Sequence, residues 1–174
     1  MVAAVVRLKI YADAVAEIAG KSFRCALGKN GITHDKKEGD NATPIGRFPL
    51  RCAYYRPDAF VTPPKTGLPL YALTPEDGWC DDVASPDYNT FVKLPHPARH
   101  EKLWRDDAVY DLIVVVGYND APVVIGKGSA IFIHIARENF AGTEGCVAFT
   151  REDLEWIVER LGAGDEIEIM GSDF

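Results

Sequence analysis

Short segments in which apolar residues alternate with polar ones, or follow one another directly, make up much of this chain. Val5–Ile10 alternates, Val15–Ile18 and Phe23–Leu27 are short apolar segments, and Asp165–Met170 alternates again near the end. The clearest signal is Val109–Gly117, which reads VYDLIVVVG and is rich in β-branched residues. A period of two over four to eight residues is typical of β-strands. The pattern therefore predicts a protein made mainly of β-strands.

Helical spacing is confined to one or two places. Thr150 can cap a helix, with Asp153 three residues on, as in the acidic form of a capping box. The residues that follow form one apolar face, and Gly162 ends the helix; the face consists of Leu154, Ile157, Val158 and Leu161. A second, short helix is predicted within residues 96–107. Its solvated face would carry His100, Glu101 and Arg105.

Residues 56–100 follow neither period and contain six prolines between positions 57 and 86. Proline donates no backbone N–H, so long helices and central strands are excluded here. An ordered loop of this length commonly forms a lid or a wall of a binding site. Within it, Gly78–Asp82 (GWCDD) makes Trp79 and Asp81 candidates for ligand contacts. Two adjacent carboxylates without further ligands are weak evidence for a metal, so no metal site is predicted.

Two strand-like segments in the last third carry the candidate chemistry. Ile131–Ile135 and Cys146–Phe149 are apolar runs joined by a polar loop that contains glycine. Pairing of these strands would bring the imidazole of His134 and the thiol of Cys146 within reach of each other. A thiolate that attacks and an imidazole that moves the proton are the minimum that nucleophilic acyl transfer needs. Gly145 has no Cβ, so a substrate carbonyl can approach the sulfur.

The same two residues also fit a purely structural interpretation. A free cysteine commonly packs as a small hydrophobic residue, and a histidine between isoleucines is commonly a hydrogen-bonded core residue. Short motifs also match by accident. The spacing of His134 and Cys146 by itself therefore leaves both interpretations open.

A wider pattern surrounds this pair. After His134 and a loop come Thr143, Glu144, Gly145, Cys146 and Val147, and TPIGRF occupies Thr43–Phe48 upstream. In this order the two motifs resemble the signature of the L,D-transpeptidase catalytic (YkuD) family, roughly HG, a loop and S-H-G-C-[IV]-R, preceded by TP-x-G-x-F. Three positions depart from that signature: Ile135 replaces a Gly, Glu144 replaces a His, and Ala148 replaces an Arg.

The resemblance implies a mixed-sheet β-sandwich of the L,D-transpeptidase catalytic-domain type, with one or two short helices. It implies Cys146 as the nucleophile, acting on the diaminopimelate carbonyl of a peptidoglycan stem peptide, and His134 as the base. The backbone carbonyl of Ile135 would orient the imidazole, and N–H groups around Gly145 and Cys146 would form the oxyanion hole. No metal or organic cofactor is needed for this chemistry.

Diaminopimelate offers a free carboxylate and a free ammonium, so the resemblance also implies a site with opposite charges. Arg137 and Arg105 are candidates for the carboxylate, because a guanidinium binds it through two hydrogen bonds. Glu144 or Asp81 would take the ammonium. The remaining candidates for substrate contacts are Thr143 and Trp79. Solvated surface pairing is the alternative for each charged residue.

Length, charge and cysteine content indicate the number of domains, the class of partner and the cellular location. A chain of 174 residues predicts one domain, 1–174, and a net charge of −7 argues against a nucleic-acid partner. The first residues lack a basic region, and Arg7 and Lys9 interrupt the apolar run, which argues against a secretory signal or a membrane anchor. Cys25, Cys52, Cys80 and Cys146 are widely spaced, so we expect free thiols in a reducing compartment. The expected location is the cytoplasm, or the periplasm if a signal peptide has been removed, and a monomer is the default.

The acyl acceptor separates the remaining functions. Water would make the protein an L,D-carboxypeptidase that removes terminal D-alanine from tetrapeptide muropeptides, which suits a cytoplasmic enzyme trimming recycled fragments. A second stem amine would make it an L,D-transpeptidase that forms 3–3 crosslinks. A non-catalytic muropeptide-binding module is the third interpretation, and Ala148 is its best argument.

Overall fold

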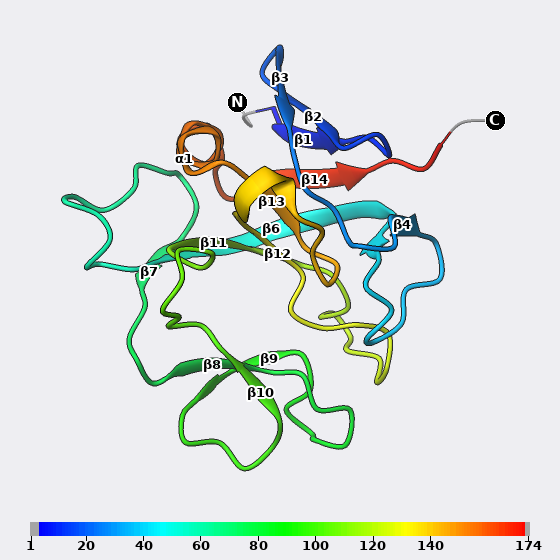
Figure 1. Cartoon of the computed structure of the whole chain (residues 1–174), viewed down its shortest axis with the longest axis vertical. Helices are drawn as coiled ribbons and strands as arrows, with labels where there is room; N and C mark the ends of the chain where they lie inside the picture. The colour runs from blue at the N-terminus through cyan, green and yellow to red at the C-terminus, as the bar shows by residue number, and fades with distance from the viewer. Residues whose placement is uncertain (1–3, 173–174) are drawn as a thin grey trace.

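The computed structural model describes residues 4–172, and its largest element is a mixed β-sheet (Figure 1). The strands of this sheet are β1 (Arg7–Ile10), β2 (Val15–Ile18), β3 (Lys21–Arg24), β6 (Gly46–Tyr55), β7 (Leu70–Ala72), β11 (Leu112–Val116), β12 (Phe132–Ile135), β13 (Val147–Phe149) and β14 (Glu166–Ile169). They follow the order β13-β12-β11-β6-β14-β1-β2-β3, with β7 beside β6. The pairs β1–β14, β6–β7 and β12–β13 are parallel, and the other pairs are antiparallel.

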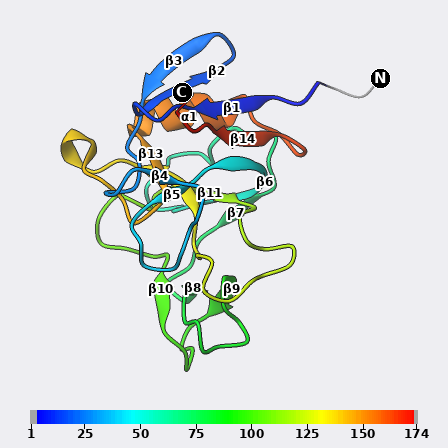
Figure 2. The same ribbon diagram turned by 90° about the vertical axis from the view of Figure 1, so that its right-hand side faces the viewer.

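The long strand β6 converts this sheet into two layers. Its first part pairs with β14 as far as Pro49, and its second part pairs with β11 from Leu50 onward. The β1–β2–β3–β14 part therefore lies above the β11–β12–β13 part, as Figures 1 and 2 show. Apolar side chains from both parts fill the space between them, including Leu8, Val114 and Ile167.

A smaller sheet covers the other face of β11 and β12. Its strands are β8 (Asp77–Cys80), β9 (Thr90–Lys93) and β10 (His100–Lys102), in the antiparallel order β10-β8-β9. Trp79 and Leu103 from this region pack with Ile113 and Phe132 in a second apolar cluster. A two-stranded parallel pair, β4 (Ile32–Thr33) and β5 (Thr43–Pro44), lies in the loop region before β6.

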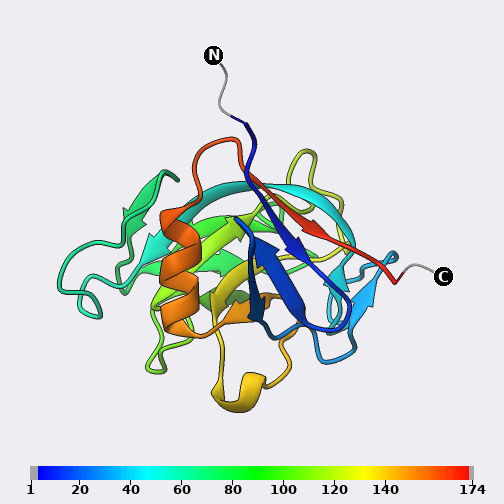
Figure 3. The same ribbon diagram turned by 90° about the horizontal axis from the view of Figure 1, so that it is seen from above.

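The helix predicted near the C-terminal end is α1, Arg151–Glu159. The Thr150 side chain accepts a hydrogen bond from the Asp153 N–H at 3.2 Å, which is the predicted cap. Figure 3 shows α1 beside β1–β3, where its apolar face joins the core between the layers. A 3-10 turn, η1, covers Glu138–Phe140. No helix among residues 4–172 is long and apolar enough to cross a membrane.

The predicted mainly β fold with a mixed sheet is confirmed, and the second helix is wrong. Residues 100–102 form β10, which pairs with β8 so that Glu101 lies opposite Trp79. A long-range pairing with a strand twenty residues earlier therefore overrides the local helical signal after Pro97. Glu101 consequently lies partly buried against β8 and not on a solvated helical face.

Candidate active site

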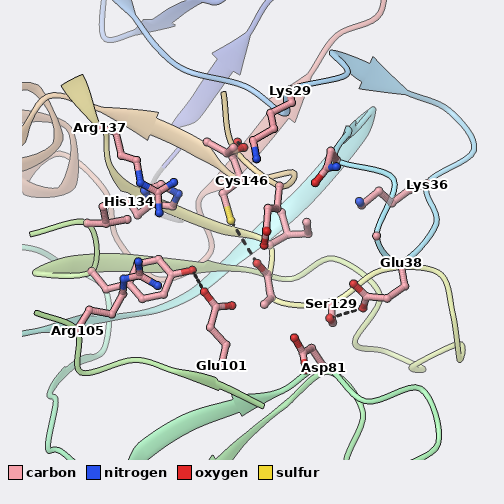
Figure 4. Close-up of a pocket in the computed structure, with 18 of the residues that line it drawn as sticks. Lys29, Lys36, Glu38, Asp81, Glu101, Arg105, Ser129, His134, Arg137 and Cys146 are labelled. Atoms are coloured by element: carbon pink, nitrogen blue, oxygen red, sulfur yellow. Dashed lines mark hydrogen bonds between the residues drawn. The ribbon is translucent and has the colours of Figure 1, made fainter. Parts of the chain in front are cut away.

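A cavity of about 690 Å³ lies between the small sheet, the loop 29–41 and the end of β12 (Figure 4). His134 and Cys146 both line it. Alternation along the strands explains this placement. Ile133 and Val147 point into the core between the layers, so His134 and Cys146 face the opposite side. The strand pairing that the sequence predicted is present, with His134 opposite Ala148 in a parallel register.

Cys146 is held in its neutral form. Its thiol donates a hydrogen bond to the Ala130 carbonyl at 3.3 Å, and its sulfur accepts one from the Phe132 N–H at 3.3 Å. Only 7% of the residue is exposed. Burial, followed by the negative charge of Glu101, raises the pKa of the Cys146 thiol to about 12. The thiol therefore needs a base or a change in its surroundings before it can attack a carbonyl.

His134 has a defined tautomer. Its Nδ1 lies 2.9 Å from the Ile135 carbonyl oxygen, and because a carbonyl only accepts, Nδ1 carries the proton. Nε2 of the neutral ring is then free to accept a proton. Burial lowers the pKa of His134 to about 4, so the ring is neutral at pH 7. The carbonyl of Ile135 thus makes the contact that the sequence argument assigned to it.

The thiol and the imidazole face the same cavity, but the described residues contain no hydrogen bond between them. Figure 4 shows the Cys146 sulfur and the His134 ring on the cavity wall. The thiol donates its hydrogen bond to the Ala130 carbonyl and not to the ring. Catalytic hydrogen bonds in empty enzymes are commonly long and tighten only with substrate. The expectation that the Cys146 sulfur and the imidazole come within reach of each other stays a prediction.

A tight turn sets the position of Cys146. The Thr143 hydroxyl donates to the Cys146 carbonyl at 2.7 Å and accepts from the Gly145 N–H at 3.1 Å. Gly145 has φ +140°, and a Cβ there would lie 2.9 Å from the Ala42 carbonyl oxygen. Glycine is therefore required at this position for steric and conformational reasons. Thr143, predicted as a substrate contact, is 4% exposed and acts mainly on the turn.

This turn changes the oxyanion hole that the sequence suggested. The Gly145 N–H already donates to the Thr143 hydroxyl, so it is not free for a substrate oxygen. Within residues 4–172 the N–H of Cys146 has no acceptor. Of the two N–H groups expected to form the oxyanion hole, only that of Cys146 is therefore available to a substrate oxygen.

All four predicted charged contacts line the cavity, and they differ in how free they are to bind a substrate. Arg105 binds Asp107 through two hydrogen bonds, at 2.9 and 2.7 Å, and Asp81 pairs with Arg99 at 3.1 Å. Arg137 and Glu144 are exposed at the cavity. No carboxylate of the described residues lies within 4.0 Å of the Arg137 guanidinium. Arg137 is thus freer than Arg105 to bind a substrate carboxylate.

Trp79 does not reach the cavity, so its prediction as a substrate contact is wrong. Its Nε1 donates to the Asn89 side-chain oxygen at 2.9 Å, and its ring packs edge-on against Phe132 at 5.1 Å. The residue is 9% exposed. Alternation along β8 turns Trp79 toward the second apolar cluster, where it supports the cavity wall from behind.

The cavity-wall residues that the sequence argument did not assign to the site include Tyr110, Glu101 and Lys36. Tyr110 packs edge-on against the His134 ring at 5.5 Å, and its hydroxyl donates to Glu101. Lys36, from the loop 29–41, is 5% exposed and forms an ion pair with Asp40. Tyr110 was detectable, because it lies within Val109–Gly117, the strongest strand signal. Glu101 and Lys36 reach the site through non-local pairing and loop packing, which leave no local sequence pattern.

The sequence model of the L,D-transpeptidase catalytic domain (YkuD) matches residues 8–169. The chain belongs to this family. Residues 8–169 include both motifs on which the resemblance rested, and they include the whole cavity wall described above. No curated protein matches the chain.

Several solved structures are similar in fold, among them structures of L,D-transpeptidases. L,D-transpeptidase 1 of Mycobacterium tuberculosis is 13% identical, with a TM-score of 0.47 over 96% of this chain and 60% of its own. An L,D-transpeptidase from Mycobacterium smegmatis is 14% identical, with a TM-score of 0.45 over 95% and 58%. The helical cell shape determining protein Pgp2 from Campylobacter jejuni is 16% identical, with a TM-score of 0.48 over 98% and 49%. The chain therefore spans half to three-fifths of the length of these proteins.

Proposed function

We propose that this protein catalyses cysteine-dependent acyl transfer on peptidoglycan stem peptides, mainly as an L,D-carboxypeptidase that removes terminal D-alanine after diaminopimelate. The observation that carries the proposal is the hydrogen bond from His134 Nδ1 to the Ile135 carbonyl. It leaves Nε2 as the proton acceptor in the cavity that Cys146 lines. Membership of the L,D-transpeptidase catalytic-domain family supports the substrate class.

The first half of the reaction uses both residues in turn. The Cys146 sulfur attacks the carbonyl carbon of diaminopimelate while its proton passes to His134 Nε2. The carbonyl electron pair moves onto oxygen, where the Cys146 N–H is positioned to donate a hydrogen bond. When the tetrahedral intermediate collapses, the C–N bond breaks and His134 returns the proton to the departing D-alanine amine. A thioester on Cys146 remains.

The second half depends on the acceptor. Water, activated by neutral His134 Nε2, adds to the thioester carbonyl; the C–S bond then breaks and the thiol regains a proton. The products are a tripeptide and free enzyme. If the amine of a second stem attacks instead, a 3–3 crosslink forms. We expect water to dominate if the protein acts on recycled muropeptides in the cytoplasm, where soluble fragments are the substrate.

Neutral Cys146 and neutral His134 suit a mechanism in which proton transfer accompanies attack. The pKa of the thiol is raised and that of the imidazole is lowered, so an ion pair is not the resting state. A ring with a low pKa also returns its proton readily to the leaving amine. The cost is a slow first step unless substrate binding changes the surroundings of the thiol.

A muropeptide-binding module without catalysis is the second candidate function. Ala148 occupies the position of the family's arginine, is fully buried, and pairs through its backbone with Ala26. The Cys146 thiol is also committed to the Ala130 carbonyl. Both observations favour a cavity that holds a ligand without attacking it.

Purified disaccharide-tetrapeptides, followed by mass spectrometry, separate the candidates. The wild-type protein should release D-alanine and leave tripeptide, whereas Cys146→Ala should release none. Cys52→Ala is the matched control, because Cys52 is a half-buried cysteine that does not line the cavity. A wild-type protein that binds the tetrapeptide without cleaving it would establish the binding module. Abundant 3–3 linked dimer would establish transpeptidation as the main reaction.

A further inference from the structure

Glu101 is a partly buried carboxylate in the cavity without a cation of its own. It enters from β10, and one of its oxygens accepts the hydrogen bond from the Tyr110 hydroxyl. Among residues 4–172, no lysine, arginine or histidine nitrogen lies within 4.0 Å of this carboxylate. Arg105 is the cation that acts on it most strongly, yet its guanidinium is engaged by both oxygens of Asp107.

An incompletely paired carboxylate in such a place is costly for an empty protein. Burial raises the pKa of Glu101 to about 7, and the charges of Glu144 and Asp81 act in the same direction. Asp81 is already paired with Arg99, and Glu144 is exposed to solvent. Glu101 therefore has the most to gain from a cation that enters the cavity with a ligand.

Glu101 is also coupled to the nucleophile through the residues between them. The Tyr110 ring lies edge-on to His134 at 5.5 Å and to Phe132 at 5.7 Å. The Phe132 N–H donates the hydrogen bond to the Cys146 sulfur. Of the charged groups around the thiol, Glu101 opposes its ionisation most, followed by Glu144, while Lys36 acts weakly in the opposite direction.

We propose that Glu101 binds a primary ammonium group of the acyl donor, and that this binding promotes ionisation of the Cys146 thiol. A cation beside Glu101 cancels the negative charge that opposes the thiolate. By linkage, the free energy by which a bound ammonium favours the thiolate equals the free energy by which the thiolate favours ammonium binding. The identity of the donor rests on the proposed function. The coupling between Glu101 and the Cys146 thiol rests only on the residues that line the cavity.

The order of the reaction steps assigns this ammonium to the acyl donor and not to the acceptor. Cys146 must lose its proton as it attacks, before the thioester has formed, so only a group already bound with the donor can assist that step. An acceptor amine arrives after the thiol has been consumed. Glu101 would thus make the nucleophile reactive mainly when a correctly charged donor fills the cavity, and would keep it unreactive otherwise.

Alkylation of Cys146 by iodoacetamide at pH 7 tests the coupling without any turnover. Adduct on the Cys146 peptide is measured by mass spectrometry, with butylammonium chloride as the probe. Sodium chloride at equal ionic strength and 1-butanol control for salt and for the alkyl chain. Lowering a thiol pKa by one unit gives about tenfold more thiolate, and the lower nucleophilicity of that thiolate leaves a net gain of about threefold.

Butylammonium should accelerate alkylation of the wild-type protein about threefold or more and in a saturable way. Glu101→Gln should react faster than wild type without the probe and should not respond to it. Glu144→Gln is the matched control, since it removes an exposed carboxylate from the same cavity and should keep the response. Thermal melts verify that each variant is folded.

Three results would overturn the proposal. They are a wild-type rate that ignores butylammonium, a Glu101→Gln variant that responds as wild type does, and a response lost in Glu144→Gln but not in Glu101→Gln. Tyr110→Phe is a second probe of the same position, because it leaves the Glu101 carboxylate without its hydroxyl donor. Butylammonium should then bind more tightly, and unchanged half-saturation would also count against the proposal.

A second arm identifies the donor as the source of the ammonium. Tetrapeptide with its free amino groups acetylated should acylate Cys146 at least about threefold more slowly than the unmodified peptide, and Glu101→Gln should remove that difference. Equal rates for both peptides in the wild type would refute the assignment to the donor. If neither peptide acylates Cys146 while butylammonium still accelerates alkylation, the proposed function fails and the coupling stands.

Discussion

Replacement of Thr143 by valine tests whether the turn before Cys146 is held by one hydroxyl. The hydroxyl donates to the Cys146 carbonyl at 2.7 Å and accepts from the Gly145 N–H at 3.1 Å. Valine has nearly the same shape, so packing is retained while both hydrogen bonds are lost. The side chain is 4% exposed, so the groups left behind have little access to water on that side.

The expected loss of unfolding free energy follows from the Cys146 carbonyl and the Gly145 N–H, which both lose their hydrogen-bond partner. A buried donor or acceptor left without a hydrogen bond costs about 1–3 kcal/mol. The adjoining cavity admits water, which favours the lower part of that range, so we expect Thr143→Val to lose roughly 2–4 kcal/mol of unfolding free energy. For a chain of this size each kcal/mol lowers Tm by about 2–4 °C, which gives a decrease of roughly 5–15 °C.

Thermal and urea unfolding, followed by circular dichroism, measure this loss against a matched variant. Thr143→Ser keeps the hydroxyl and removes only a methyl group, which costs about 1 kcal/mol. Thr143→Val should therefore be clearly less stable than Thr143→Ser. If the two variants unfold together, or if valine is within about 0.5 kcal/mol of wild type, the hydroxyl does not hold the turn.

Three further outcomes are expected. Cys146→Ala should abolish turnover with little loss of stability, and Cys146→Ser should be nearly inactive in the tetrapeptide assay because a hydroxyl is far less ionised. Arg137→Ala should lower kcat/KM by about tenfold or more if it binds the carboxylate; values within about twofold for it and for Arg105→Ala would exclude both. The pKa of Glu101 is raised from 4.5 to about 7 and that of His134 lowered from 6.5 to about 4. As pH rises from 4.5 to about 7, Glu101 lowers the free energy of unfolding, and as pH rises from about 4 to 6.5, His134 raises it. The two effects nearly cancel in the wild type. Glu101→Gln should therefore make the free energy of unfolding rise visibly with pH where wild type changes little.

Local patterns predicted the elements that carry Cys146 and His134. Both lie on short apolar segments whose alternation fixes which face each side chain takes, and β12 and β13 are in fact neighbours. The capped helix α1 was equally visible, because Thr150 and the apolar spacing after it are local signals. The resemblance to the family added the contact between the His134 ring and the Ile135 carbonyl, which fixes the tautomer and which spacing alone would not have suggested.

The rest of the site depends on contacts between distant segments. Glu101 reaches the cavity because β10 pairs with β8, and a three-residue strand inside a proline-rich stretch has no distinct periodicity. Trp79 was misplaced for the same reason, since its direction depends on which face of β8 packs on Phe132. Lys36 is buried by an ion pair with Asp40 within a loop, where charged sequence predicts exposure.

The charges around Cys146 explain why the departures from the family signature need not remove activity. Glu144 in place of the family's histidine and Ala148 in place of its arginine make the surroundings of the thiol more negative than the signature would. Glu101 adds to that effect, and together with burial it keeps the thiol neutral. A donor that brings a cation into the cavity supplies what the sequence has lost. The nucleophile would then depend on its substrate for activation, which restricts wasteful reaction with other electrophiles.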